Sequence, residues 1–193
     1  MALRPWKKLS EAVVATNPWW TYRRDRCLLP GGTEGEYHYV HTGGSSMVLP
    51  LGTDGRILLV NQYRYLMRRE SLEFPCGSVK EGSTHEQTAR EELIEETGYR
   101  AGTLREIGAF NPYNGVTDEM CRVYLGTALV HVGSAPEETE EFELVWLNPQ
   151  EIESRIRDGS LWDGMTVAAW ALARDLVEPR GGADRGVFGE FSP

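Results

Sequence analysis

The segment from residue 90 to residue 98 constrains the chain most, because it places four carboxylates, at Glu91, Glu92, Glu95 and Glu96, within six consecutive residues. In a helix, Glu92, Glu95 and Glu96 stand at positions i, i+3 and i+4 and therefore share one face. Each like-charge pair costs about 0.2 to 0.5 kcal/mol in an isolated helix, and a cation bound between the carboxylates removes that repulsion. The pattern indicates either a divalent-cation site or a solvated acidic helix face.

The residues around this segment predict the helix that carries it. Thr84 with Gln87, or Ser83 with Glu86, has the spacing of a capping box, and Gly98 is a C-terminal stop signal. We therefore expect a helix over roughly residues 84–97. Carboxylate oxygens with retained water suit Mg²⁺ or Mn²⁺, and the segment contains no His or Cys that would favour zinc.

Composition indicates one globular domain with an additional arm or tail. The chain has 193 residues, somewhat more than a typical domain of about 150. Apolar residues make up 40% and charged residues 25%, so neither a disordered chain nor a membrane bundle is indicated. Apolar runs such as residues 57–60 are far shorter than the about 20 residues that a bilayer requires. The basic N-terminus lacks the apolar region of a secretory signal, so we expect a cytoplasmic protein.

Charge and cysteine content exclude further classes. The net charge of -9, without a basic stripe, argues against a nucleic-acid partner. An acidic protein can still bind a phosphorylated small molecule through divalent cations held by its own carboxylates. Cys27, Cys76 and Cys121 have no C-x-x-C spacing, which predicts reduced thiols rather than a disulfide framework or a zinc site.

The order of the predicted elements favours an α+β fold, because strands are mixed with a few helices rather than alternating strictly with them. We expect an aromatic-rich N-terminal β subdomain over residues 1–45, a main domain over 46–177 and a loosely held tail over 178–193. Strands are predicted at 19–22, 36–41, 46–51, 56–63, 73–77, 105–110, 119–130 and 141–147, and helices after Asn148-Pro149 and at 164–177. An Asp-Gly turn is expected to join 46–51 and 56–63 in a hairpin.

At its acidic helix the chain resembles the Nudix hydrolase family, whose box reads G-x5-E-x7-R-E-U-x-E-E-x-G-U, with U a bulky apolar residue. The matching positions are Gly77, Glu92, Leu93, Glu95, Glu96, Gly98 and Tyr99. The family's first glutamate and its arginine are replaced by Ser83 and Glu91. In the family these two residues are thought to support each other, so their joint replacement indicates the loss of a supporting pair. The resemblance implies a Nudix-like α/β/α sandwich with a mixed sheet.

Within that family the chain resembles the ADP-ribose and nucleoside diphosphate sugar pyrophosphatases over roughly residues 15–177. The segments that carry this resemblance are 61–65, 73–77, 115–119 and 137–141. A proline that often precedes the glycine in the ADP-ribose enzymes is Asn114 here. The resemblance implies metal-dependent hydrolysis of ADP-ribose or a related nucleoside diphosphate sugar, giving a nucleoside monophosphate and a sugar phosphate.

The resemblance also implies a metal site that takes Mg²⁺, with Mn²⁺ as a substitute. Glu92 and Glu96 are the first choices as ligands, and the backbone carbonyl of Cys76 completes the site. Glu95 is either a third ligand or a partner that orients the ligands. Glu73, just before the box, is assigned to substrate binding.

A general base must reach the attacking water. In the resembling subgroup it is often a glutamate on a loop after the box, where Glu138 and Glu140 lie, and Glu119 is a third candidate. The alternative interpretation of residues 136–141 is a solvated acidic turn.

Fixed positive and aromatic groups complete the predicted site. Arg64 is the preferred phosphate ligand, whereas Arg68 and Arg69 are as well explained by ion pairs with neighbouring glutamates. Trp19 and Trp20 are candidates for stacking on a nucleobase, and the alternative is that they fill a core or a dimer seam.

Two other functions stay open at this stage. One is a Nudix enzyme for another nucleoside diphosphate derivative, such as a dinucleoside polyphosphate. The other is a Nudix-like binding or regulatory module that has lost activity, which the replacements at Ser83 and Glu91 would allow. The exposed aromatic segment from Trp6 to Tyr39 predicts a homodimer in which the N-terminal β unit packs on its partner. We expect no nucleic-acid or membrane partner.

Overall fold

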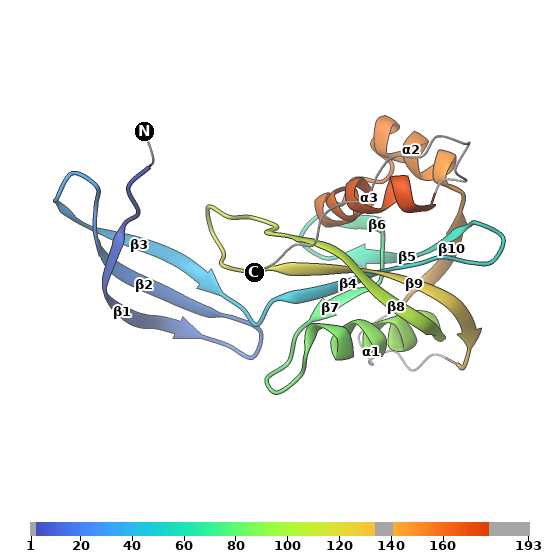
Figure 1. The fold of residues 1–193 in the computed structure, drawn as a ribbon, viewed down its shortest axis with the longest axis horizontal. Helices are drawn as coiled ribbons and strands as arrows, with labels where there is room; N and C mark the ends of the chain where they lie inside the picture. The colour runs from blue at the N-terminus through green and yellow to red at the C-terminus, as the bar shows by residue number, and fades with distance from the viewer. Residues whose placement is uncertain (1–2, 134–140, 178–193) are drawn as a thin grey trace.

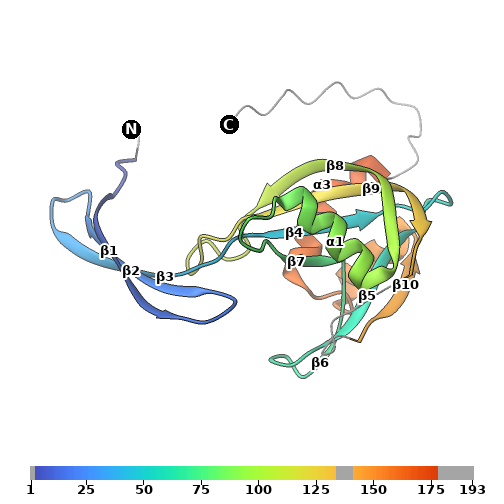
Figure 2. The same cartoon turned by 90° about the horizontal axis from the view of Figure 1, so that it is seen from below.

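The strands of the chain fall into an N-terminal group and a larger second group (Figure 1). The structure is a computed structural model, and it describes residues 3–133 and 141–177. Three antiparallel strands in the order β1-β2-β3 form the N-terminal sheet: β1 (Lys7–Thr16), β2 (Thr21–Leu28) and β3 (Glu34–His41). This sheet extends away from the rest of the molecule, as Figure 2 also shows.

The turn between β1 and β2 differs from the sequence prediction. The side-chain oxygen of Asn17 accepts hydrogen bonds from the backbone N–H groups of Trp19 and Trp20, both at 2.9 Å. Both tryptophans lie in this Asx-type turn. Strand β2 therefore begins at Thr21, and the strand predicted from residue 19 was placed two residues too early.

The N-terminal sheet has almost no core of its own. Cys27 is the only buried side chain among residues 3–41, and nine of the ten residues of β1 are exposed. Backbone hydrogen bonds and side-chain contacts attach the sheet to the loop between β8 and β9. Val40 donates to the carbonyl of Val116 at 2.8 Å, and His41 Nδ1 lies 2.7 Å from a carboxylate oxygen of Asp118.

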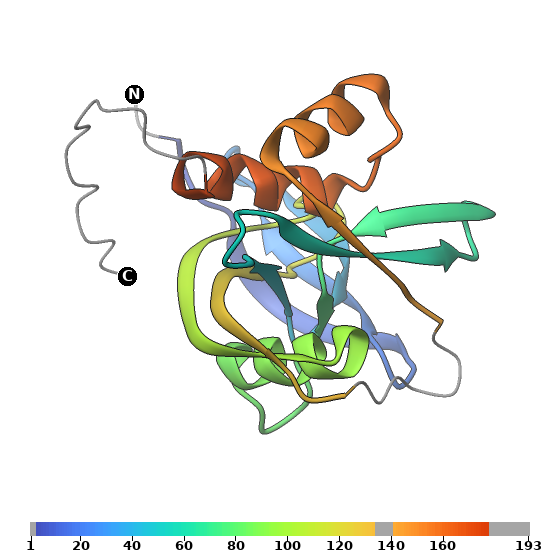
Figure 3. The same cartoon turned by 90° about the vertical axis from the view of Figure 1, so that its right-hand side faces the viewer.

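The larger domain contains two sheets between helices. One sheet has the order β7-β4-β9-β8 and the other has the order β10-β5-β6. Their strands are β4 (Ser45–Pro50), β5 (Ile57–Arg64), β6 (Arg69–Glu73), β7 (Cys76–Ser78), β8 (Tyr99–Phe110), β9 (Cys121–His131) and β10 (Glu143–Leu147). Helix α1 (His85–Thr97) covers one side, and α2 (Pro149–Asp158) and α3 (Gly164–Val177) cover the other (Figure 3). Strands β4 and β9 are parallel while the other pairs are antiparallel, so the predicted sandwich with a mixed sheet is confirmed.

The predicted hairpin of residues 46–51 and 56–63 is wrong in its pairing. Only an isolated bridge joins Leu51 to Ile57, after which β4 and β5 enter different sheets. All six residues of β4 and the first four of β5 are buried, and each strand lies in the middle of its own sheet. The predicted strand 73–77 is likewise interrupted, because Pro75 has no N–H group and separates β6 from β7.

Alternate residues of β4 build the core on both faces of its sheet. Met47 and Leu49 pack with Phe74 and Trp170 on the side of α3. Val48 points the other way and packs with Leu93 of α1. The strand that begins next to the acidic helix is therefore held from both sides.

Helix α1 begins and ends as the sequence predicts. The Thr84 side chain accepts from the backbone N–H of Gln87 at 3.2 Å, and the Gln87 side chain accepts from the backbone N–H of Thr84 at 2.8 Å. Gly98 follows in the left-handed conformation with φ 73°. The helices predicted after Asn148 and at 164–177 are also confirmed. Within residues 3–133 and 141–177, no helix has the length and apolar character needed to span a bilayer.

Replacing Thr84 by alanine removes one half of this capping box. We expect Thr84→Ala to lower the free energy of unfolding by about 1 kcal/mol, because the first turn of α1 loses a hydrogen-bond acceptor. Urea unfolding followed by circular dichroism measures the change. Thr84→Ser keeps the hydroxyl and should stay close to the wild-type value; equal stability of the alanine and wild-type proteins would contradict this role of the cap.

Candidate active site

Strand β7 lies directly against a carboxylate of helix α1 at Gly77. A Cβ atom added to Gly77 would overlap the carboxylate of Glu92, and the nearest atom would be Oε1. The missing side chain at residue 77 thus allows a carboxylate from α1 to lie directly against the backbone of β7. Gly77 pairs with Ser46 of β4, so the sheet fixes its position.

Glu96 joins Glu92 beside Cys76. The pKa of the Cys76 thiol is raised well above its ordinary value, first by its hydrogen bond with the Cys121 thiol and by burial, and then by the charges of Cys121, Glu96 and Glu92. Glu96 is buried, with an exposed fraction of 6%. The charges of the two carboxylates that the sequence ranked first as metal ligands therefore both act on Cys76.

These residues fit a hydrated hard cation better than a closed metal site. Across residues 3–133 and 141–177, no three His, Cys, Asp or Glu side chains are close enough together to enclose a metal ion. Mg²⁺ needs fewer protein ligands than such a closed site provides, because it keeps several waters and is usually bound by one or two carboxylates together with substrate phosphates. Glu92, Glu96 and the backbone carbonyl of Cys76 suit such an ion. Glu95 is half-buried on α1, no contact described here involves it, and its predicted role stays a prediction.

Of the two departures from the box pattern, one lies on α1 and the other precedes it. Arg90 donates to Glu86 one turn earlier, at 2.7 Å, so its guanidinium is engaged in a surface ion pair. Glu91 is exposed, and Ser83 lies just before the helix. Arg90 therefore does not replace the missing arginine of the box.

Arg64 and Glu73 form a bidentate ion pair across strands β5 and β6. Arg64 Nε donates to Glu73 Oε1 at 2.8 Å, and a second bond joins Nη2 to Oε2. The hydrogen bond with Glu73 raises the pKa of Arg64, and the charges of Asp163 and Glu96 add to that effect. The Glu73 side chain is 4% exposed whereas that of Arg64 is 47% exposed, so the guanidinium remains open to a ligand.

The Arg64–Glu73 ion pair and Cys76 face a common cavity of about 580 Å³. Its lining includes Arg64, Glu73 and Cys76, which the sequence predicted, together with Trp162 and Asp163, which it did not. Asp163 could have been recognised as a helix cap, because its carboxylate accepts from the backbone N–H of Thr166 at 2.7 Å at the start of α3. No sequence signal identified Trp162.

Arg68 and Arg69 do not line this cavity. Arg68 lies in the turn between β5 and β6 with a φ of 53°, and the Arg69 guanidinium stacks 4.0 Å from the ring centroid of Trp162. Their assignment to phosphate binding stays a prediction.

Glu119 is held by Ser45, the first residue of β4, in the four-stranded sheet that also contains Cys76 and Gly77 of β7. Ser45 Oγ donates to Glu119 Oε1 at 2.7 Å, and Ser45 pairs with Cys121 in the parallel ladder. The hydrogen bond from Cys76 lowers the pKa of the Cys121 thiol, while burial and the charges of Glu119 and Asp163 oppose that shift. The charges of Glu119 and Asp163 therefore both act on the Cys121 thiol.

The other two candidate bases, Glu138 and Glu140, lie outside the described residues. The same is true of the tail predicted over 178–193.

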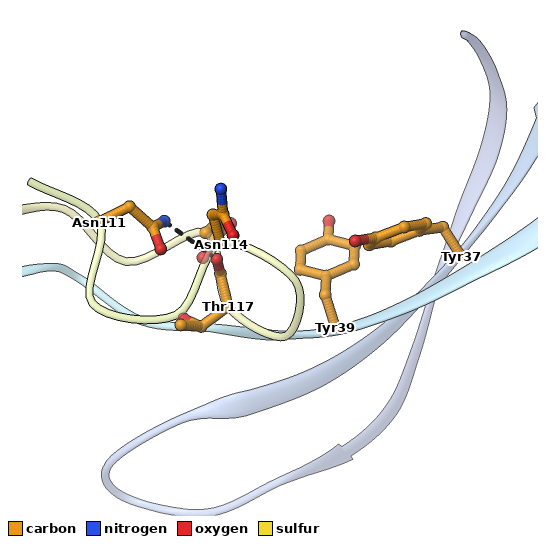
Figure 4. A pocket seen from close by; sticks show the side chains of 6 residues that line it. Tyr37, Tyr39, Asn111, Asn114 and Thr117 are labelled. Atoms are coloured by element: carbon orange, nitrogen blue, oxygen red, sulfur yellow. Dashed lines mark hydrogen bonds between the residues drawn. The ribbon is translucent and has the colours of Figure 1, made fainter.

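A second cavity, of about 380 Å³, lies where the N-terminal sheet meets the loop between β8 and β9. Figure 4 shows Tyr37 and Tyr39 of β3 on one side, and Asn111, Asn114 and Thr117 of the loop on the other. Trp19 and Trp20 do not line it; they lie in the β1–β2 turn with exposed fractions of 76% and 42%. Their predicted stacking on a nucleobase is untested.

Comparison with known sequences agrees with this geometry. Residues 41–167 match the NUDIX domain, and residues 6–40 match the nucleoside diphosphate sugar hydrolase N-terminal domain. The chain belongs to the Nudix family. It is a Nudix pyrophosphohydrolase, so the predicted enzyme class is confirmed. Members of this family generally use divalent metal ions, which suits the carboxylates beside Cys76.

Individual relatives are similar over most of their length. An ADP-ribose pyrophosphatase of Mycobacterium tuberculosis is 29% identical over 93% of this chain and 90% of its own. A CMP-5'-(N-acetyl-N-hydroxy-3-aminopropyl)phosphonate hydrolase of Streptomyces rubellomurinus is 30% identical over 80% of this chain and 75% of its own. A crystal structure of an ADP compounds hydrolase superposes with a TM-score of 0.80 at 18% identity, covering 94% of this chain and 98% of its own, which shows the shared fold.

Adding a methyl group at Gly77 tests the position of Glu92. We expect Gly77→Ala to weaken Mn²⁺ binding about tenfold or more, because the new Cβ displaces the Glu92 carboxylate. Electron paramagnetic resonance of free Mn²⁺ measures the affinity. Gly164→Ala is the control, since a Cβ there meets no atom within 4 Å. Unchanged Mn²⁺ affinity in a folded Gly77→Ala protein would show that Glu92 is not a ligand.

Proposed function

We propose that this chain hydrolyses the pyrophosphate bond of ADP-ribose or a related nucleoside diphosphate sugar, with Mg²⁺ as its metal. The observation that carries the proposal is the Glu92 carboxylate against the backbone of Gly77, next to Cys76, which lines the same cavity as the Arg64–Glu73 pair. The similarity to a named ADP-ribose pyrophosphatase along nearly the whole chain supports the choice of substrate.

The reaction consumes one water. The water oxygen forms a bond to one phosphorus, the bond between that phosphorus and the bridging oxygen breaks, and a nucleoside monophosphate and a sugar phosphate leave. Glu92, Glu96 and the carbonyl of Cys76 would hold Mg²⁺, which neutralises charge on the phosphate oxygens and activates the water. Arg64 binds a phosphate oxygen through N–H groups that Glu73 does not use, and the buried Glu73 keeps the guanidinium in place.

A carboxylate must accept the proton of the attacking water. The candidates remain Glu119, Glu138 and Glu140. Glu119 is supported by its hydrogen bond to Ser45, the first residue of β4. The next residue of β4, Ser46, pairs with Gly77, which lies against Glu92. Glutamine variants of all three, compared by their pH–rate profiles, identify the base as the residue whose loss removes the acidic limb.

A second candidate function is the hydrolysis of another nucleoside diphosphate derivative. The similarity to a hydrolase named for a CMP-linked phosphonate favours it, since that relative covers 80% of this chain. Incubation of the protein with Mg²⁺ and a panel that includes ADP-ribose, nucleoside diphosphate sugars and dinucleoside polyphosphates, with product identification, distinguishes the two. Cleavage of none of them would overturn both.

We also propose that the protein is a cytoplasmic homodimer built through its N-terminal sheet. Strand β1 is an edge strand with unpaired backbone groups on one side, and Leu9, Val13 and Val14 of this strand are exposed. A three-stranded sheet with one buried side chain lacks the core that would stabilise it alone. Packing against a second copy would supply that core.

Neutralising Glu96 tests the metal assignment. We expect Glu96→Gln to lower kcat on the order of 10²-fold at saturating Mg²⁺, because the amide keeps the shape of the side chain but loses the negative charge that the ion requires. Steady-state kinetics with ADP-ribose measures the loss. Glu91→Gln, on the exposed side of the same helix, should retain the wild-type kcat. Near-wild-type turnover of Glu96→Gln would refute the assignment.

Charges placed on β1 test the dimer. We expect the Val13→Glu/Val14→Glu variant to be a monomer, because two carboxylates would have to be desolvated in the proposed interface. Multi-angle light scattering gives the mass in solution, with a dimer expected for the wild type. Leu172→Glu places the same change on a partly exposed position of α3 and should leave the mass unchanged. A monomeric wild-type protein would contradict the proposal.

A further inference from the structure

The 580 Å³ cavity has a wall that the proposed hydrolysis leaves unexplained. Trp162 and Met165, from the turn before α3 and its first residues, form one side, and residues 65–67 at the tip of the β5–β6 hairpin form another. Cys76 lies in the same cavity. A large aromatic side chain thus lines the same open cavity as Arg64 and Cys76, which are proposed to act on the pyrophosphate.

Trp162 is fixed in position by contacts outside the cavity. Its indole N–H donates to the backbone carbonyl of Glu70 at 3.0 Å, and the Arg69 guanidinium lies 4.0 Å from its ring centroid. Trp162 lines the cavity whereas Arg69 does not, so Arg69 contacts the ring from outside the cavity. The polar atom of Trp162 is already satisfied, and an apolar surface remains for a ligand.

The surroundings of Trp162 select the kind of ligand. The positively charged guanidinium of Arg69 already lies over the Trp162 ring. A cationic ligand on the same ring would be repelled by Arg69, whereas a neutral aromatic ring would not. Most of the side chains that line the cavity are apolar, aromatic or sulfur-containing, including Met47, Met67 and Met165. The charged ones already have partners within the chain, because Arg64 binds Glu73 and Asp163 caps the first turn of α3. A sugar would require several hydrogen-bonding partners there, while a nucleobase needs mainly a face on which to stack.

We infer that Trp162 is the platform on which the nucleobase of the substrate stacks. This inference rests on the proposed function and adds to it a residue that binds the base end of the substrate. The pyrophosphate then extends from the indole towards Arg64 and Cys76 within the same cavity.

Tryptophan fluorescence tests the inference without substrate turnover. Adenosine 5′-monophosphate is titrated against the full chain, which has six tryptophans. We expect quenching in the wild type and in Trp146→Phe, and loss of that quenching in Trp162→Phe. Trp146 is the matched control because it also carries a cation–π contact, from Arg56 at 5.8 Å, in a different pocket. Quenching that persists in Trp162→Phe, or equal quenching by ribose 5-phosphate, would overturn the inference.

Calorimetry of the same titration measures the contribution of the ring to affinity. Trp162→Phe keeps an aromatic face and should bind the nucleotide within about threefold of the wild type, whereas Trp162→Leu should bind about tenfold more weakly. Tyr39→Leu, in the other cavity, should bind like the wild type. Loss of binding in Tyr39→Leu with normal binding in Trp162→Leu would place the base in that other cavity and overturn the inference. Should Trp162→Leu fail to fold, the fluorescence of Trp162→Phe still decides the question.

The two proposals can fail separately. A wild-type protein whose Trp162 fluorescence responds to the nucleotide, but which cleaves no nucleoside diphosphate derivative, would overturn the proposed function alone. Cleavage of ADP-ribose with a kcat/KM that Trp162→Leu leaves unchanged would overturn the role of Trp162 alone.

Discussion

The contact between the Glu92 carboxylate and the backbone of Gly77 is the constraint on which the rest of the active site depends. It requires that β7 carry no side chain at this position and that α1 start at a defined residue, so that Glu92 reaches the strand. The capping box at Thr84 and the left-handed Gly98 fix both ends of the helix. Packing of Leu93 against Val48 then holds the acidic face next to Cys76.

Local signals were enough to predict the elements whose limits are set by their own side chains. Helix α1 was predicted because its caps are encoded by a few residues close in sequence, and α2 was predicted in the same way from Asn148-Pro149. Which strands pair with each other was harder to predict, because an Asp-Gly turn specifies that the chain reverses direction but not that the two flanking strands hydrogen-bond to each other. Strands β4 and β5 separate because each is buried within its own sheet. Trp162 was missed because its importance arises from contacts with the distant β6, which no local pattern reports.

The electrostatics of the cavity follow from the same packing. Arg64 lies within reach of the charges of Glu73, Asp163 and Glu96, so one guanidinium is surrounded by several carboxylates in a chain whose net charge is already -9. Such a site repels an anionic substrate when it is empty of counter-ions. A divalent cation bound by Glu92 and Glu96 would reverse the local sign of the potential, which suits this acidic pocket to the diphosphate of the proposed substrate.

The nearly coreless N-terminal sheet has a consequence for how the molecule loses its structure. With Cys27 as the one buried side chain among residues 3–41, these strands contribute little hydrophobic free energy of their own. Their amide protons should exchange with solvent far sooner than those of β4, and a dilute solution should favour their fraying while the sandwich stays intact. In the proposed homodimer, order in residues 3–41 would therefore depend on protein concentration, and a thermal melt would not have to be a single transition.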